Sequence, residues 1–422
     1  MQTDAQLDEA ARAILRKNDR GGYTVPTDGL YPYQWNWDSG FAAWGFATFD
    51  LPRAWAELEN LLRGQWPSGM VPHILFHRSD PDYYPGPEVW GGKGPIASSG
   101  ISQPPVAISF AQRMLAQDPA QGRAPAGRLF DGFRAWLGWF MAWRTDAAGA
   151  VCVTHPWEAG RDNAPDWDGP MAAIDPVDVG DYQRRDTSHV DPHMRPTKYD
   201  YDRYIWLVQL GRRLGWDDAA WKAENPFRVA DPTMTFTTLR AARDLARMGR
   251  MLGRDTAEIE AWIPRLEAGA ASLWNPDLGA YDARDVHAAD AWAGSLSNAS
   301  FLSWYAGLRD DRMLGQYDRI AAAMPHGVPS FDPGADRFDP RRYWRGPVWA
   351  IMNALIGLGL EEAGHATRAQ ALRAGTGELI RANGFAEYYD PRDGTPAGGG
   401  AFTWTAAVWL AWAGRAPREE AG

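Results

Sequence analysis

Helical periodicity constrains the fold of this chain more than any other feature of its sequence. Apolar residues recur every three or four positions in about a dozen stretches, and no convincing strand series or βαβ rhythm appears. Two of these stretches, 348–360 and 402–412, are apolar on nearly every side, which indicates helices buried all round. Others, such as 365–381, carry one charged face. Buried and half-exposed helices in alternation predict an all-α barrel with an inner and an outer ring.

The connections between the helices differ greatly in length. The helices are predicted at 3–18, 41–50, 53–63, 105–117, 129–143, 200–214, 235–252, 257–273, 297–308, 312–324, 347–362, 365–381 and 402–413. The segments 67–104, 151–199 and 325–346 are long and rich in Gly, Pro, Asp and aromatic residues. Long loops inside a compact domain are usually functional. No linker-like composition or repeat interrupts the chain, so we predict one domain over residues 1–422.

Composition and charge exclude several classes of function. The formal net charge is −10 and no Lys/Arg run offsets it, which argues against a nucleic-acid or anionic-membrane partner. The chain has no run of 18 apolar residues and no signal-peptide pattern, so we expect a cytoplasmic protein. Cys152 is the single cysteine, and the pairs His73/His77 and His189/His193 lack an adjacent glutamate. We therefore expect no metal, and no glycine motif predicts a phosphate-bearing cofactor.

Tryptophan is the most over-represented residue type. The 23 Trp residues are about four times the average usage, and together with 31 Pro and 44 Gly they suggest a deep aromatic pocket walled by loops. In segment 31–40 four aromatic residues surround Asp38 just before a predicted helix. Asp38 could cap that helix. It could also bind sugar hydroxyls while the rings face the C–H side of the sugar.

Segment 154–168 combines four carboxylates with Trp157 and Trp167 and is too rich in Pro and Gly for a helix. It could be a solvated acidic loop. If the tryptophans bury it, however, the pKa of a carboxyl group there rises, as a general acid requires.

Two further segments near the C-terminus carry candidates. Glu387 lies among aromatic residues in 385–390, either as a salt-bridge partner or as a base that faces the pocket. The glycines at 398–400 permit close approach of a ligand or a helix. In 343–349, Pro347 suits the first position of a helix, and the aromatic residues around it are candidate pocket walls.

Four strings, taken in order, resemble glycoside hydrolase family 63. They are Trp-Asn-Trp-Asp-Ser-Gly at 35–40, Trp-Glu-Ala-Gly-Arg-Asp-Asn-Ala-Pro-Asp-Trp-Asp at 157–168, Tyr-Trp-Arg-Gly-Pro-Val-Trp at 343–349 and Glu-Tyr-Tyr-Asp-Pro at 387–391 with the glycine-rich stretch after it. The resemblance spans 31–407, although single strings also occur in trehalase-like and debranching relatives. It implies an (α/α)6 barrel, a six-hairpin toroid with long functional loops at one end. The chain length and the strings 184–190 and 195–197 resemble the bacterial mannosylglycerate and glucosylglycerate hydrolases within that family.

The resemblance also implies an inverting α-glycosidase with Asp162 as general acid and Glu387 as general base. In such an enzyme the two carboxyl groups stand about 6.5–9.5 Å apart, which leaves room for a water. The implied sugar-site residues are Tyr31, Trp35, Trp37, Asp38, Gln103, Tyr343, Trp344 and Trp349. Arg195 and Tyr201, with Tyr83 or Tyr84, are implied to hold a glycerate group.

The chain departs from the family pattern at Ala159, Arg161 and Ala164, where relatives usually carry Ser, an apolar residue and Ser. Because Arg161 beside Asp162 would favour the ionised acid if it pointed inward, we expect it to point away. These departures leave the catalytic chemistry unchanged and bear on the identity of the substrate.

Alternatives to a small anionic glycoside remain open at this point. The same machinery could hydrolyse a neutral α-glucoside such as trehalose. Arg195 could instead form a structural ion pair with Asp191 or Asp200. A sugar epimerase would need paired pocket histidines, and a non-catalytic carbohydrate-binding protein would have no use for both carboxylates. The sequence leaves gluco or manno preference and the oligomeric state open.

Overall fold

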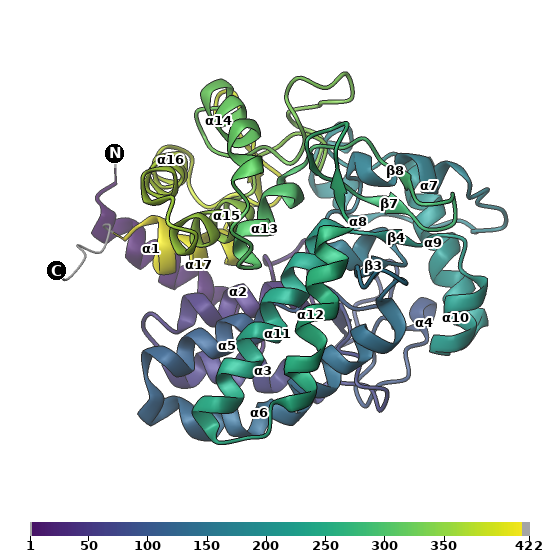
Figure 1. The fold of residues 1–422 in the computed structure, drawn as a ribbon, viewed down its shortest axis with the longest axis horizontal. Helices are drawn as coiled ribbons and strands as arrows, with labels where there is room; N and C mark the ends of the chain where they lie inside the picture. The colour runs from purple at the N-terminus through teal and green to yellow at the C-terminus, as the bar shows by residue number, and fades with distance from the viewer. Residues whose placement is uncertain (1, 416–422) are drawn as a thin grey trace.

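The computed structural model describes residues 2–415 and is mainly helical, as predicted (Figure 1). Residues 1 and 416–422 of the predicted domain lie outside the described part. None of the helices in that part combines the length and the apolar character that a bilayer crossing requires.

A closed ring of largely buried helices forms the centre of the molecule. Each helix packs on the next, and the last returns to the first. In order they are α2 (Asn36–Phe46), α5 (Val106–Gln117), α11 (Pro232–Leu252), α13 (Leu302–Tyr305), α15 (Ala350–Glu362) and α17 (Thr403–Val408). Every residue of α2 is buried, and α15 is buried from its first residue to Leu360. This matches the apolar character of 348–360 in the sequence.

A second set of helices covers this ring from outside. In Figure 1, for example, α12 runs beside α11, and α16 beside α15. The set comprises α1 (Asp4–Asn18) on α17, α3 (Leu51–Arg63) on α2, α6 (Pro119–Trp139) on α5, α12 (Ala257–Ala271) on α11 and α16 (Ala366–Asn383) on α15. Helix α3 illustrates how the sequence sets such an element. Asp50 caps the amide of Arg53, and Ala54, Leu58 and Leu61 bury one face.

Several helix boundaries differ from the prediction, and the starts of three helices illustrate this. The helix predicted from 41 begins at Asn36. The helix predicted from 129 begins at Pro119 and has Pro125 in its interior, a residue that normally interrupts helices. The helix predicted from 347 begins at Ala350, because Val348 pairs with Pro329 and Tyr389 in antiparallel bridges that hold the preceding residues extended.

The long connections contain short strands and helical turns. Strand β1 (Gln34–Trp35) pairs antiparallel with β2 (Ile74–Leu75), and β9 (Tyr388–Tyr389) pairs with β10 (Pro396–Ala397). A four-stranded antiparallel sheet has the order β3 (Cys152–Val153), β4 (Val229–Ala230), β7 (Arg284–Asp285) and β8 (Ala291–Trp292). Figure 1 shows this sheet on the right, beyond the ends of α11 and α12.

The remaining elements are short, apart from α9. They are α4 (Pro87–Trp90), α7 (Asp168–Ala172), α8 (Arg185–His189), α9 (Lys198–Arg213), α10 (Asp218–Glu224), α14 (Leu314–Ala323), η1 (Phe140–Arg144), η2 (Pro156–Ala159), η3 (Pro165–Trp167), η4 (Pro192–Met194), η5 (Asn298–Phe301), η6 (Asp311–Met313), η7 (Trp409–Ala413), β5 (Trp274–Asn275) and β6 (Ala280–Tyr281). The segments around η2, α8 and η4 supply much of the wall of the pocket described next.

Candidate active site

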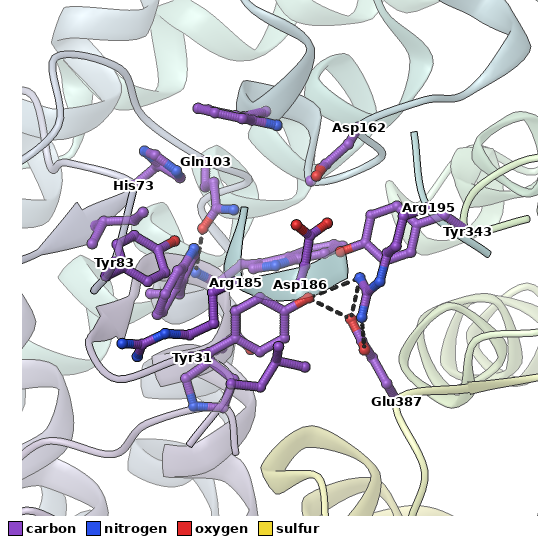
Figure 2. A pocket seen from close by; sticks show the side chains of 18 of the residues that line it. Tyr31, His73, Tyr83, Gln103, Asp162, Arg185, Asp186, Arg195, Tyr343 and Glu387 are labelled. Atoms are coloured by element: carbon purple, nitrogen blue, oxygen red, sulfur yellow. Dashed lines mark hydrogen bonds and ion pairs between the residues drawn. The ribbon is translucent and has the colours of Figure 1, made fainter. Parts of the chain in front are cut away.

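A pocket lined by aromatic rings and charged groups lies where these connections meet (Figure 2). The pocket and its mouth enclose about 890 Å³. Of the residues predicted to form the site, it brings together Asp162, Glu387, Tyr31, Trp35, Trp37, Asp38, Tyr83, Tyr84, Gln103, Arg195, Tyr201 and Tyr343. Residues separated by more than 300 positions in the chain therefore share one cavity.

Trp344 and Trp349 do not line this pocket, so their prediction as pocket walls is wrong. Both are buried, and their rings stack on each other with centroids 3.8 Å apart. Trp344 lies behind Trp37, with centroids 6.0 Å apart, and Trp349 packs against Tyr343 at 5.2 Å. Trp37 and Tyr343 occupy the wall, and the tryptophan pair supports them from the core.

The segment that carries Asp162 is folded into the core rather than solvated, so the interpretation as a solvated acidic loop is wrong. Residues 151–161 are all buried. At its bend Gly160 has a φ of +70°, and a Cβ there would come within 2.6 Å of the Trp37 ring. Only glycine suits both conditions. The hydroxyl of Tyr204 donates to the main-chain oxygen of Asp162 at 2.9 Å and holds the residue beyond this bend.

The other three carboxylates of this segment form ion pairs away from the pocket. The partner pairs are Glu158 with Arg144, Asp166 with Arg161, and Asp168 with Arg345. Arg161 points away from Asp162 as expected. Its fully buried guanidinium also reaches Asp231 at 2.9 Å. Of the four carboxylates, Asp162 is the one that lines the pocket.

The surroundings of Asp162 favour its protonated form. Removal from bulk water raises its pKa from the ordinary 3.8 to about 7. Arg195 opposes this shift, and the charges of Asp186 and Glu387 add to it. A carboxyl group with this pKa can donate a proton near neutral pH.

Glu387 lies on the other side of the pocket in Figure 2, beside strand β9. Glu387 is buried, with 1% of its surface exposed. Its carboxylate accepts a hydrogen bond from the amide of Gly399 at 2.8 Å and another from the hydroxyl of Tyr31 at 3.0 Å. Gly398 has a φ of +73°, and a Cβ there would come within 2.3 Å of Glu387 Oε2. The glycine-rich stretch therefore permits close approach to the side chain of Glu387.

Arg195 reaches the same carboxylate. Its Nη2 lies 2.8 Å from Glu387 Oε2, and its Nη1 donates to Tyr31 Oη at 2.9 Å. The guanidinium lies over the ring of Tyr343, 4.5 Å from its centroid. The alternative pairing with Asp191 or Asp200 is therefore wrong. The ion pair that Arg195 forms is with Glu387.

Asp38 lies in the first turn of α2, whose N-cap is Trp35, so it does not cap the helix. Burial raises the pKa of Asp38 well above its ordinary value. Among residues 2–415 its Oδ1 finds no hydrogen-bond partner. A buried carboxyl oxygen at a pocket wall can accept a ligand hydroxyl. Close to it, Gln103 Oε1 accepts the amide of Trp37 at 3.2 Å.

The structure adds pocket residues to which sequence reasoning assigned no role. Asp186 and Arg185 line the cavity, and Figure 2 shows both among its side chains. Arg184 donates to both oxygens of Asp186 at 3.0 and 2.7 Å, and Arg185 pairs with Asp80 at 2.6 Å. The string 184–190 did signal the subgroup, but the sequence could not tell which of its charges face the pocket. The other additions are Pro26, Leu30, His73, Ile74, Pro85, Gly160, Pro196, Phe402 and Trp404. Trp157, one of the two tryptophans expected to bury the segment of Asp162, also lines the cavity.

The part of the chain that the structure describes contains no group of three His, Cys, Asp or Glu residues placed to hold a metal ion. His73 lines the pocket, but its Nδ1 lies 2.7 Å from the hydroxyl of Ser99, and burial lowers its pKa well below the usual value. Besides its aromatic rings, the pocket offers four carboxyl groups, those of Asp38, Asp162, Asp186 and Glu387, and the guanidinium groups of Arg185 and Arg195.

Comparisons with known proteins agree on one family. Residues 31–405 match the model of the "Mannosylglycerate hydrolase MGH1-like glycoside hydrolase domain". The chain is 42% identical to mannosylglycerate hydrolase MGH1 of Selaginella moellendorffii, over 97% of this chain and 86% of that protein. It is 33% identical to the glucosylglycerate hydrolase of Mycolicibacterium hassiacum, over 98% of each.

A solved structure shows the same similarity in three dimensions. The crystal structure of the GH63 mannosylglycerate hydrolase from Thermus thermophilus, in complex with Tris and D-glycerate, superposes with a TM-score of 0.92. The two chains are 41% identical, and the match covers 96% of this chain and 99% of the other.

Proposed function

This chain belongs to the MGH1-like family of glycoside hydrolases, and we propose that its substrate is a small anionic α-glycoside, glucosylglycerate or mannosylglycerate. One observation carries the proposal: a single aromatic pocket contains two carboxyl groups suited to acid and base roles and a buried guanidinium. The names of the relatives and the D-glycerate in the solved structure support the same substrate class.

The two carboxyl groups divide the reaction between them. Asp162, protonated through its raised pKa, gives its proton to the glycosidic oxygen as the bond from that oxygen to C1 breaks. A water attacks C1 from the opposite face and loses a proton to Glu387. The oxygen of the water forms the new bond to C1, so the configuration at C1 inverts.

The rest of the pocket binds the two halves of the substrate. Trp35, Trp37 and Tyr343 offer rings to the sugar, and Asp38 offers an unpaired oxygen to its hydroxyls. Arg195 binds the glycerate carboxylate, and Tyr83 and Tyr201, which line the same pocket, contact the rest of the glycerate group. The guanidinium has capacity for this, because within residues 2–415 its buried Nε has no acceptor.

We also propose that the closed ring of helices with its outer cover is an (α/α)6 barrel in one domain. The succession α2, α5, α11, α13, α15 and α17, with outer helices packed on most of them, supports this architecture. The pocket then lies at the end of the barrel that carries the long connections.

Proton NMR of the anomeric signals tests the proposed function. Purified protein is mixed separately with glucosylglycerate, mannosylglycerate and trehalose, and the first sugar released is recorded before mutarotation. We expect β-sugar from one or both glycerate glycosides. Release of α-sugar would contradict inversion. Cleavage of trehalose alone would favour a neutral α-glucoside as substrate.

A further inference from the structure

The hydrogen bonds to Glu387 occupy its whole capacity as an acceptor. Tyr31 Oη donates to Oε1 at 3.0 Å and Arg195 Nη1 donates to Oε1 at 3.4 Å. Arg195 Nη2 and the Gly399 amide each donate to Oε2 at 2.8 Å. An ionised carboxylate offers about four acceptor positions. A base needs one of them for the water whose proton it takes, so at least one of these donors must leave before Glu387 can act.

The donors differ in how easily they can leave. The Gly399 amide belongs to the main chain, and the residue is held in place because the Glu387 amide donates to Gly399 O at 2.8 Å. It is therefore fixed. Arg195 and Tyr31 donate through side chains that line the cavity, and Arg195 supplies two of the four bonds. Departure of Arg195 would free one position on each oxygen of Glu387.

A substrate carboxylate can draw Arg195 away. Guanidinium groups bind carboxylates through paired charge-assisted hydrogen bonds, so one carboxylate can replace another with little change in the kind of bond. Arg195 lines the pocket, and its Nε has no acceptor within residues 2–415. A neutral glycoside carries no charge that could compete with Glu387 for this buried cation.

We propose that Arg195 caps the general base Glu387 in the unliganded enzyme, and that the carboxylate of the substrate takes over the guanidinium and so frees the base. This inference rests on the proposed function. The anionic group of the substrate then acts on kcat as well as on binding. A neutral glycoside with the same sugar occupies the sugar site but meets a capped base.

Activation of a neutral substrate by a separate carboxylate tests the capping. The wild-type enzyme is assayed on methyl α-mannopyranoside and methyl α-glucopyranoside, whose small aglycone leaves the glycerate side open. Sodium acetate is added at constant ionic strength, and acetamide, which has the same shape without the charge, is the matched control. We expect acetate to raise kcat at least about fivefold with saturation, and acetamide to leave it unchanged.

The outcomes separate the inference from the function on which it rests. No rise with acetate, or an equal rise with acetamide, overturns the capping. Hydrolysis of a glycerate glycoside by the same preparation leaves the proposed function intact. Failure to hydrolyse either glycerate glycoside counts against the proposed function itself.

Binding of the product gives a second and independent test. Calorimetry compares D-glycerate with neutral glycerol as ligands of Glu387→Gln, Asp162→Asn and the wild type. Glu387→Gln removes the competitor for Arg195, so we expect D-glycerate to bind about tenfold more tightly and glycerol to bind unchanged. Asp162→Asn is the matched control, because Asp162 lines the same pocket without an ion pair to Arg195. An equal gain in both variants would overturn the capping. It would show that the loss of any carboxylate from the pocket strengthens the binding of D-glycerate, whether or not that carboxylate pairs with Arg195.

Discussion

The dependence of kcat/KM on pH tests Asp162 as the general acid. Burial raises its pKa from 3.8 to about 7, so near pH 7 about half of the molecules carry the proton. With the ordinary pKa, only about one in 1,600 would carry it. The difference corresponds to about 4 kcal/mol in favour of the protonated form. On a glycerate glycoside we expect kcat/KM to fall about tenfold per pH unit above pH 7, as the proton is lost.

Two variants and two substrates separate this role from a general loss of activity. On the glycerate glycoside, Asp162→Asn should lose about 10²- to 10⁴-fold in kcat and lose its pH dependence between pH 6 and 8. On the α-glycosyl fluoride, whose leaving group needs no proton, the same variant should stay within about tenfold of the wild type. Asp38→Asn is the control. This carboxyl group is buried in the same pocket, and we expect its loss to affect both substrates alike. The assignment would be refuted if Asp162→Asn lost equal activity on both substrates. It would also be refuted if kcat/KM of this variant still fell near pH 7.

Three further predictions concern the support of the site and can be checked with kinetics and urea unfolding followed by tryptophan fluorescence. Gly398→Ala should lower kcat at least about tenfold, because the positive φ and a Cβ 2.3 Å from Glu387 Oε2 force that carboxylate to move; wild-type kcat would contradict this. Arg161→Met should lower the free energy of unfolding by about 3–5 kcal/mol, because it leaves two buried aspartates without their cationic partner. Arg128→Met, which breaks an exposed pair, is the control and should lower it by less than about 1 kcal/mol. Similar losses in the two variants would count against a special role for the buried cluster. The folded-state pKa of Asp162 lies above its unfolded value, so the folded state binds more protons between pH 4 and 7 and loses about 2–4 kcal/mol of stability as pH rises through that window. The free energy of unfolding of Asp162→Asn should therefore rise relative to that of the wild type as the pH is raised from 5 to 8. A difference between the two proteins that does not change with pH would contradict the raised pKa.

The prediction of a mainly helical fold is confirmed, because helical periodicity records which side of each helix faces the core. The all-apolar stretch 348–360 corresponds to α15, which is buried from its first residue to Leu360. Boundaries were less predictable where tertiary contacts overrode local preference. Pro347 suited a helix start, yet the bridges of Val348 to Pro329 and Tyr389 delay the helix to Ala350.

Asp162 and Glu387 became candidates for acid and base because the short motifs around them resemble those of the family, and both residues line the pocket. A glycine precedes Asp162 by two residues and another follows Glu387 by eleven, and in each case a side chain approaches so closely that no Cβ is possible. The sequence could not show that Trp344 and Trp349 turn inward to stack on each other. The direction of a ring on an irregular segment depends on backbone angles, such as the positive φ of Tyr343, that distant contacts impose.

The sequence by itself determined the helical class, the aromatic character of the pocket, the family and the residues that are candidates for its chemistry. These properties depend on residue types and on spacings along the chain. Only the tertiary structure decided that Arg195 pairs with Glu387 instead of with an aspartate near it in sequence, and that three of the four carboxylates in 154–168 are neutralised by arginines. Charge pairing depends on which segments meet in space and on how much water they exclude, and both follow from the packing of the whole chain.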